Sequence, residues 1–91
     1  MVDNKPYEEY NKDDYRIRFF DRCCNNSELI WHKDKKNRTV EVVNGGGWEM
    51  QFDNQLPFKL TTGMIVEVPK ETFHRVLKGS DNLVVKIIEI D

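Results

Sequence analysis

The sequence has few of the features that define several classes of protein. It contains only two cysteines, Cys23 and Cys24, and because they are adjacent they cannot close a loop as an intramolecular disulfide. We interpret them as reduced structural thiols, with a redox or thiol-ligand role as the alternative. No apolar run approaches the roughly 18 residues that span a bilayer, and the start, MVDNKPYEEY, lacks the apolar segment of a signal peptide. We therefore expect a soluble, cytoplasmic protein with no membrane partner.

The sequence also lacks an excess of one charge. Lys and Arg number 14 against 16 Asp and Glu, which gives a formal net charge of -2 over 91 residues. Nucleic-acid-binding domains usually carry a basic field, so we expect no nucleic-acid partner. A chain of this length can bury one modest core, so we expect one folded domain.

What the sequence does contain is a series of short apolar or alternating stretches separated by turn residues. The stretches are YRIRFFDR, ELIWHKD, RTVEVV, WEMQF, LPFKL, MIVEV, FHRVL and LVVKIIEI, and the separators are NNS, NGGG, DNQ, TTG, PKE and GSDN. Eight short strands at a spacing of about ten residues, without a segment of helical period, are typical of an all-β barrel or sandwich with little or no helix. In the last stretch Lys86 and Glu89 have opposite parity, and a β-bulge would let both reach solvent.

The first 14 residues differ in texture from the rest. They carry five acids and few aliphatic side chains, which favours a mobile polar arm over residues 1–14. The barrel is then expected over residues 15–91.

The chain has only two histidines, His32 and His74, and each lies in a predicted strand near a turn. If the strand is unbroken through the lysines that follow, His32 and Asp34 point the same way as Val40 and Val42, into the barrel. His74 is also inward by parity. Two imidazoles and one carboxylate form the facial set that suits a non-haem Fe(II) with open coordination positions.

A simpler interpretation exists for each of these residues. The stretch WHKDKKNR, residues 31–38, has the composition of a solvated charge run or a hairpin tip. A single histidine such as His74 is more often a hydrogen-bonded residue of a core or rim than a metal ligand. The sequence pattern alone leaves both interpretations open.

From Glu28 to Ile90 the sequence resembles the cupin superfamily, and in particular the compact single-domain cupins of bacteria and tailed phages. The second cupin motif, G-x5-PxG-x2-H-x3-N, is matched by Gly63, Pro69 and His74. Glu71 stands in place of the middle glycine and Lys78 in place of the final asparagine. The resemblance implies a small jelly-roll-like β-barrel of about eight strands that forms a homodimer, and an enzyme of this type would be an oxygenase or an isomerase.

The first cupin motif, G-x5-HxH-x3,4-E-x6-G, is matched less completely. His32 and Gly45 match it, Asp34 stands where the second histidine is expected, and Asn26 replaces the leading glycine. Arg38 stands where the family's glutamate ligand is expected, and an arginine cannot ligate a metal because it stays protonated. The resemblance therefore implies either a three-ligand site for Fe(II), Mn, Ni or Zn, or a metal-free site in which Arg38 pairs with Asp34.

The remaining candidates concern the ligand. Lys36 and Arg38 share the inward parity of the predicted site, so we expect a small anionic molecule as ligand. Trp48, Met50 and Phe52 fall on one face of WEMQF and provide either an apolar wall for that ligand or plain core. Two functions remain open: a metal-dependent enzyme of dioxygenase-like chemistry, and a non-catalytic module that binds or sequesters the anion. The stretch YRIRFFDR is a candidate for strand addition in a homodimer.

Overall fold

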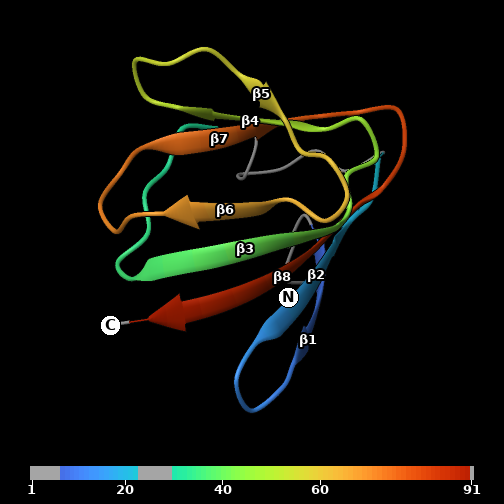
Figure 1. The fold of residues 1–91 in the computed structure, drawn as a ribbon, viewed down its shortest axis with the longest axis vertical. Coiled ribbons are helices and arrows are strands. Elements are labelled where there is room, and N and C mark those ends of the chain that lie inside the picture. Colours follow the sequence, from blue (N-terminus) through green and yellow to red (C-terminus); the bar gives the residue numbers. More distant parts are fainter. Residues whose placement is uncertain (1–6, 23–29, 91) are drawn as a thin grey trace, which may run out of the picture.

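The computed structural model describes residues 7–22 and 30–90, which form eight strands in two antiparallel sheets (Figure 1). The strands are β1 (Tyr7–Asn11), β2 (Arg16–Phe20), β3 (Asn37–Asn44), β4 (Glu49–Phe52), β5 (Phe58–Lys59), β6 (Ile65–Val68), β7 (His74–Leu77) and β8 (Leu83–Ile90). One sheet has the order β1-β2-β8-β3-β6 and the other β5-β4-β7. The described residues include no helix, and so none that could cross a membrane.

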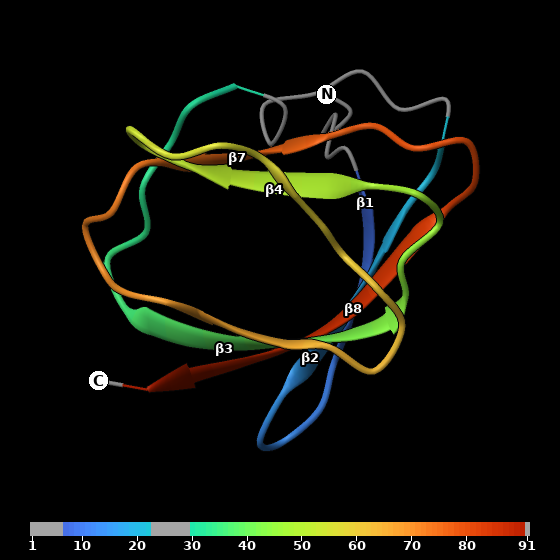
Figure 2. The ribbon, with the colours of Figure 1, turned by 45° about the horizontal axis from the view of Figure 1, so that its top comes forward.

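The two sheets face each other and enclose one core, which Figure 2 shows as an open ring of strands seen end-on. The core follows from alternation, because successive side chains of a strand point to opposite faces. In β6, for example, Val66 and Val68 are buried while Ile65 and Glu67 are exposed. The buried hydrophobic residues are Phe20, Val40, Val42, Trp48, Met50, Leu60, Val66, Val68, Val76, Leu83, Val85 and Ile87. The all-β fold predicted from the sequence is therefore confirmed.

The strand predictions hold in all stretches but one. Each predicted stretch except ELIWHKD contains a strand. The described part of ELIWHKD, residues 30–34, forms only a single bridge, between His32 and His74. Cys23, Cys24, Asn26 and the start of ELIWHKD lie outside the described residues.

The boundary of the barrel also needs correction. Tyr7–Asn11, which falls within the expected polar arm, forms the edge strand β1 and pairs with β2 from Tyr7 opposite Phe20 to Asn11 opposite Arg16. Its inner face meets side chains of β2, since Glu9 pairs with Arg18. Because β2 has β1 on one side and β8 on the other, YRIRFFDR is not a sheet edge and has no edge to offer a second copy. The homodimer itself stays a prediction.

The expected bulge in the last strand is not where the sheet is irregular. The register shifts in β3 instead, between Val42 and Asn44, opposite a continuous β8. Glu89 continues the inner parity of Val85 and Ile87, and it lies opposite Arg38 in the register. It reaches solvent because the barrel ends there, so no bulge in β8 is required.

Candidate metal centre

Two backbone hydrogen bonds bring the histidines together. His32 N donates to His74 O at 3.0 Å, and His74 N donates to His32 O at 2.8 Å. The bridge sets the two imidazole rings 4.4 Å apart between centroids. The premise of an unbroken strand is wrong, because β3 begins only at Asn37. The inward orientation of His32 comes from this bridge to β7.

Both imidazoles are oriented in the same way by a carbonyl group two residues earlier. His32 Nδ1 lies 2.8 Å from Ile30 O, and His74 Nδ1 lies 2.8 Å from Thr72 O. A carbonyl oxygen can only accept a hydrogen bond, so Nδ1 carries the proton in each ring. In the neutral ring the lone pair is then on Nε2. Hydrogen bonding of the distal ring nitrogen to a backbone carbonyl is the usual arrangement for metal-binding histidines.

Asp34 completes the group, and its two oxygens have different surroundings. Oδ1 lies 3.3 Å from Nη1 of Arg38. Oδ2 lies 3.3 Å from Nε2 of His74, yet it is buried and accepts no hydrogen bond from the residues that the structure describes. Buried polar atoms are nearly always satisfied, so a buried carboxylate oxygen without a donor calls for an explanation. A cation at this position would provide one.

Electrostatics keep this carboxylate ionised. Burial by itself raises the pKa of Asp34, but the contact of its carboxylate with the His74 ring and the charge of Arg38 outweigh burial and bring that pKa below its ordinary value. The ligand atoms offered by His32, Asp34 and His74 all lie within 4.8 Å of one another. Two metal–ligand bonds of about 2.1 Å each span up to about 4.2 Å, so the group is close to the spacing that one ion requires.

Arg38 is paired with a second carboxylate besides that of Asp34. Its Nε donates to Glu89 Oε2 at 3.0 Å and its Nη2 lies 3.0 Å from the same oxygen. Arg16 approaches that oxygen as well, at 2.7 Å. Burial raises the pKa of Glu89, but the hydrogen bond from Arg38 and the charges of both arginines lower it below its ordinary value. Arg38 therefore spans two carboxylates: it holds Oδ1 of Asp34 and is itself neutralised by Glu89.

The site opens on a cavity of about 50 Å³ inside the barrel. Its polar lining consists of Arg18, His32, Asp34, Arg38 and His74, and the rest is apolar. Pockets that enclose drug-sized ligands measure about 300–1,000 Å³. The cavity therefore suits a small ligand.

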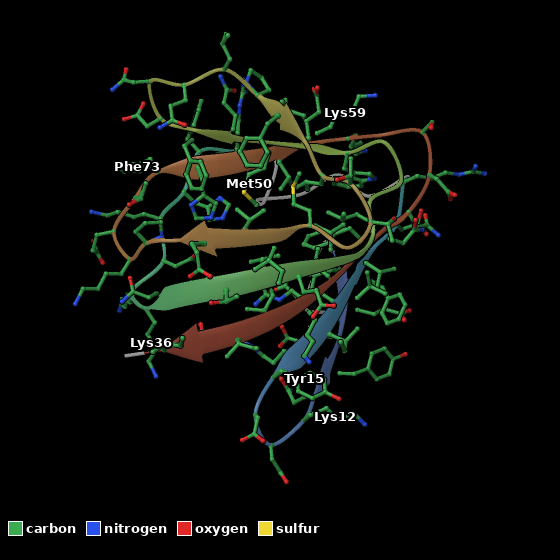
Figure 3. The ribbon with its side chains drawn as sticks, viewed as in Figure 1. Lys12, Tyr15, Lys36, Met50, Lys59 and Phe73 are labelled. Carbon is green, nitrogen blue, oxygen red and sulfur yellow. The ribbon has the colours of Figure 1, made fainter. Side chains whose placement is uncertain are left out.

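Of the apolar residues predicted to bind the ligand, only some line the cavity. Met50 lines the cavity and points from β4 into the space between the sheets (Figure 3). Trp48 does not: it is fully buried and donates from Nε1 to Asp81 O at 2.6 Å, as a core residue. Phe52 stacks on Phe58 with centroids 6.0 Å apart and reaches 6.2 Å from the His74 ring, at the edge of the site.

Lys36 is the clearest correction among these residues. It is exposed and lies outside the barrel, where β3 begins and β8 ends (Figure 3). It lines a separate polar cleft with residues of the β1–β2 turn. The inward parity predicted for Lys36 requires a continuous strand, but the chain bends at residues 35 and 36, before β3. The bend breaks the alternation, so Lys36 does not face the cavity.

Sequence reasoning missed two residues of the site, Arg18 and Glu89. Arg18 shares the inner face of β2 with Phe20, and the parity of RIRFF could have identified it. Glu89 has inward parity in LVVKIIEI, opposite to that of Lys86. From the sequence alone, this difference predicts a bulge and not a charged residue at the site. Its partner Arg38 lies 51 residues away, so only the strand register reveals the pair.

Glu71 connects the segment before β7 with the segment that carries His32 and Asp34. Its backbone N–H donates to Asp34 O at 2.7 Å, and its carboxylate lies 3.0 Å from Lys33 Nζ. Glu71 has φ of 60°, the left-handed region where the cupin motif places glycine.

Comparison with known proteins supports the fold and leaves the activity open. No family model and no curated protein matches the sequence. Among solved structures, an RmlC-like cupin family protein with a double-stranded β-helix fold from Methanocaldococcus jannaschii superposes with a TM-score of 0.69 at 18% identity, over 91% of this chain and 76% of that one. A cupin domain from Bordetella pertussis gives a TM-score of 0.65 at 16% identity, over 100% and 99% of the two chains.

The chain has a cupin fold. The resemblance predicted from the two motifs is confirmed at the level of the fold. A third similar structure is the DMSP lyase DddQ from Ruegeria pomeroyi, with a TM-score of 0.72 at 11% identity. The match covers 94% of this chain and 47% of DddQ, so this chain spans about half the length of that enzyme. The superpositions establish a shared fold, but sequence identities this low do not transfer a function. The function therefore has to be argued from the site.

Proposed function

We propose that this cupin-fold protein binds one divalent transition-metal ion through His32, Asp34 and His74 and acts on a small anionic ligand in the barrel. The observation that carries the proposal is Oδ2 of Asp34, a buried carboxylate oxygen that accepts no hydrogen bond from the described part of the chain. It lies beside Nε2 of His74, while both histidines have Nδ1 committed to a backbone carbonyl. The ligand atoms that His32, Asp34 and His74 offer lie within 4.8 Å of one another, which supports a single shared ion.

The donor set limits the choice of ion. Two imidazoles and one carboxylate suit Fe(II), Mn, Ni or Zn, and three protein ligands leave positions open, as in catalytic sites. Bound there, the ion would act as a Lewis acid on an oxygen of the ligand or, as Fe(II), support oxygenase chemistry. The walls of the cavity are mostly apolar, and the contact of Arg38 with Oδ1 restrains the carboxylate of Asp34.

The alternative, a metal-free pocket with Arg38 as the principal anion anchor, has less support. The guanidinium of Arg38 makes two contacts with Glu89 and one with Asp34. A cation matched by two carboxylates attracts a further anion weakly. We therefore place the anion at the metal and keep Arg38 as a positioning residue.

Elemental analysis tests the proposal directly. Protein purified without chelator and then titrated with Fe(II), Mn, Co, Ni and Zn is expected to bind one ion per chain. Asp34→Asn and His74→Ala should lose this uptake, while the matched control Asp53→Asn, at an exposed turn position outside the site, should keep it. Failure of the wild-type protein to take up any of the five ions would refute the metal centre.

A further inference from the structure

Two ligands of the proposed centre, His32 and Asp34, lie on a segment that forms no continuous strand. The described part of this segment, residues 30–34, joins β7 through a single backbone bridge, between His32 and His74. The bridge consists of two hydrogen bonds, of 3.0 and 2.8 Å, and a third backbone hydrogen bond runs from Glu71 N–H to Asp34 O. A metal centre requires its ligands at a fixed spacing, so the side-chain contacts of this segment bear on metal binding.

The outer side of the bridge carries two aromatic rings and two cations. Side chains alternate along a strand, so the residues that flank the two bridged histidines point away from the barrel. The antiparallel pairing places Trp31 opposite Arg75. It places Lys33 opposite Phe73 in the same way. The aromatic residues Trp31 and Phe73 are 38% and 44% exposed, as expected for an outer face.

Each of these opposed pairs brings a cation over the face of a ring, and we call them the outer pairs. The guanidinium carbon of Arg75 lies 4.7 Å from the centre of the Trp31 ring, and Lys33 Nζ lies 5.4 Å from the centre of the Phe73 ring. Both distances are within the range of about 6 Å over which a ring attracts a cation. Arg75 is also held by β4, because its Nε donates to Gln51 Oε1 at 2.9 Å. The outer pairs therefore connect the segment to β7 and, through Gln51, to β4.

We propose that the outer pairs position His32 and Asp34 for metal binding from outside the barrel; this inference rests on the proposed function. The pairs hold the residues before and after His32, so they limit how far its imidazole can turn or withdraw from His74. A metal ion binds only the docked segment, so its apparent affinity falls when docking is weakened. One cation–aromatic contact at an exposed site corresponds to about 2- to 5-fold in an equilibrium constant.

Replacing the aromatic rings tests this role without changing the charge around the site. The double variant W31A/F73A removes both outer pairs and is expected to weaken Co(II) binding by the full chain about 5- to 25-fold. In the metal-free protein, hydrogen exchange of the His32 and His74 backbone N–H groups should accelerate, because both donate in the bridge. Trp31→Phe keeps a ring opposite Arg75 and should retain most of the wild-type Co(II) affinity.

Tyr15→Ala is the matched control. The Tyr15 ring also lies under a cation, with Lys86 Nζ 4.4 Å from its centre, but it does not line the cavity of the metal centre. Its loss should leave the Co(II) affinity and the two exchange rates as in wild type. Equal Co(II) affinity in W31A/F73A and wild type, with both folded by thermal melting, would overturn the positioning role.

Two further outcomes are kept distinct. If W31A/F73A does not fold, Trp31→Ala and Phe73→Ala are titrated singly, each with an expected loss of about 2- to 5-fold, and unchanged affinity in both would again overturn the proposal. If the wild-type protein takes up no Co(II), the metal centre itself fails. The exchange rates of the metal-free proteins then still test whether the outer pairs hold the bridge.

Discussion

Glu71 offers a prediction that depends on the backbone alone. Its φ of 60° lies in the left-handed region, which costs a residue with a Cβ about 1–2 kcal/mol. Glycine adopts this region freely but loses about 0.5–1 kcal/mol through its greater freedom in the unfolded chain. We therefore expect Glu71→Gly to be more stable than Glu71→Ala by about 0.5–1 kcal/mol. Both variants lose the Lys33 ion pair, so its contribution cancels in the comparison.

The comparison with wild type depends on that ion pair. Lys33 and Glu71 have side chains 47% and 53% exposed, and surface pairs of this kind contribute about 0–1 kcal/mol. Glu71→Ala keeps the strain and loses the pair, so it should be less stable than wild type. Glu71→Gly relieves the backbone strain but loses the ion pair and gains freedom in the unfolded chain. Its stability should therefore be close to that of the wild type. The backbone donation to Asp34 O survives in both variants, because it uses the main-chain N–H.

Thermal and urea unfolding measure this order. For a domain of this size a difference of 1 kcal/mol corresponds to about 4–8 °C in Tm, so Gly and Ala should differ by about 2–8 °C. Glu41 is the control position, because it is exposed in the extended strand β3, where glycine is less favourable than alanine. The order of the two variants should reverse there. If Glu71→Ala is as stable as Glu71→Gly, the left-handed backbone is not what glycine provides in this motif.

Two further predictions concern the charged rim and the core. The lowered pKa of Glu89 means that its carboxylate stabilises the fold above the ordinary value of 4.5, and that this contribution fades as pH falls through the lower folded value. Glu89→Gln should be about 1 kcal/mol or less below wild type at pH 7 and converge with it in acid; urea melts with a constant difference from pH 7 to pH 3 would contradict this. Trp48→Phe opens a void in the core and removes the donor to Asp81 O, so urea unfolding should show a loss of about 2–3 kcal/mol. A loss below about 1 kcal/mol would argue against the core role of Trp48.

The fold could be predicted wherever the signal is local. Alternation within MIVEV and WEMQF states which face of each strand is buried, and the turn residues between stretches state where strands end. The edge strand β1 escaped this reasoning because its sequence, YEEYN, is polar. Its inner acid, Glu9, is neutralised by Arg18 of the next strand, a partner that composition does not reveal. A polar stretch of this kind therefore resembles a mobile arm by its composition alone.

The candidate site could be predicted only in part for a similar reason. His32, Asp34 and His74 were found through motif spacing, and the structure brings their ligand atoms together. Lys36 was placed wrongly because parity holds only within a continuous strand, and the chain bends before β3. Glu89 was missed as a partner of Arg38 because pairing between strands depends on register, which the sequence of one strand does not contain.

The exchange of a glutamate for Arg38 bears on which ligand the proposed centre would attract. With two neutral imidazoles and one carboxylate, a divalent ion would keep a formal charge of +1. A fourth ligand of the glutamate type would cancel that charge, whereas Arg38 contributes no negative charge and shares the carboxylate of Glu89 with Arg16. Coulomb attraction in a cavity of low polarity is stronger than in water. A three-ligand centre in this barrel therefore favours an anion over a neutral molecule. An uncompensated Arg38 would repel the ion itself, and its contact with Glu89, which lies opposite it in the sheet, reduces that repulsion.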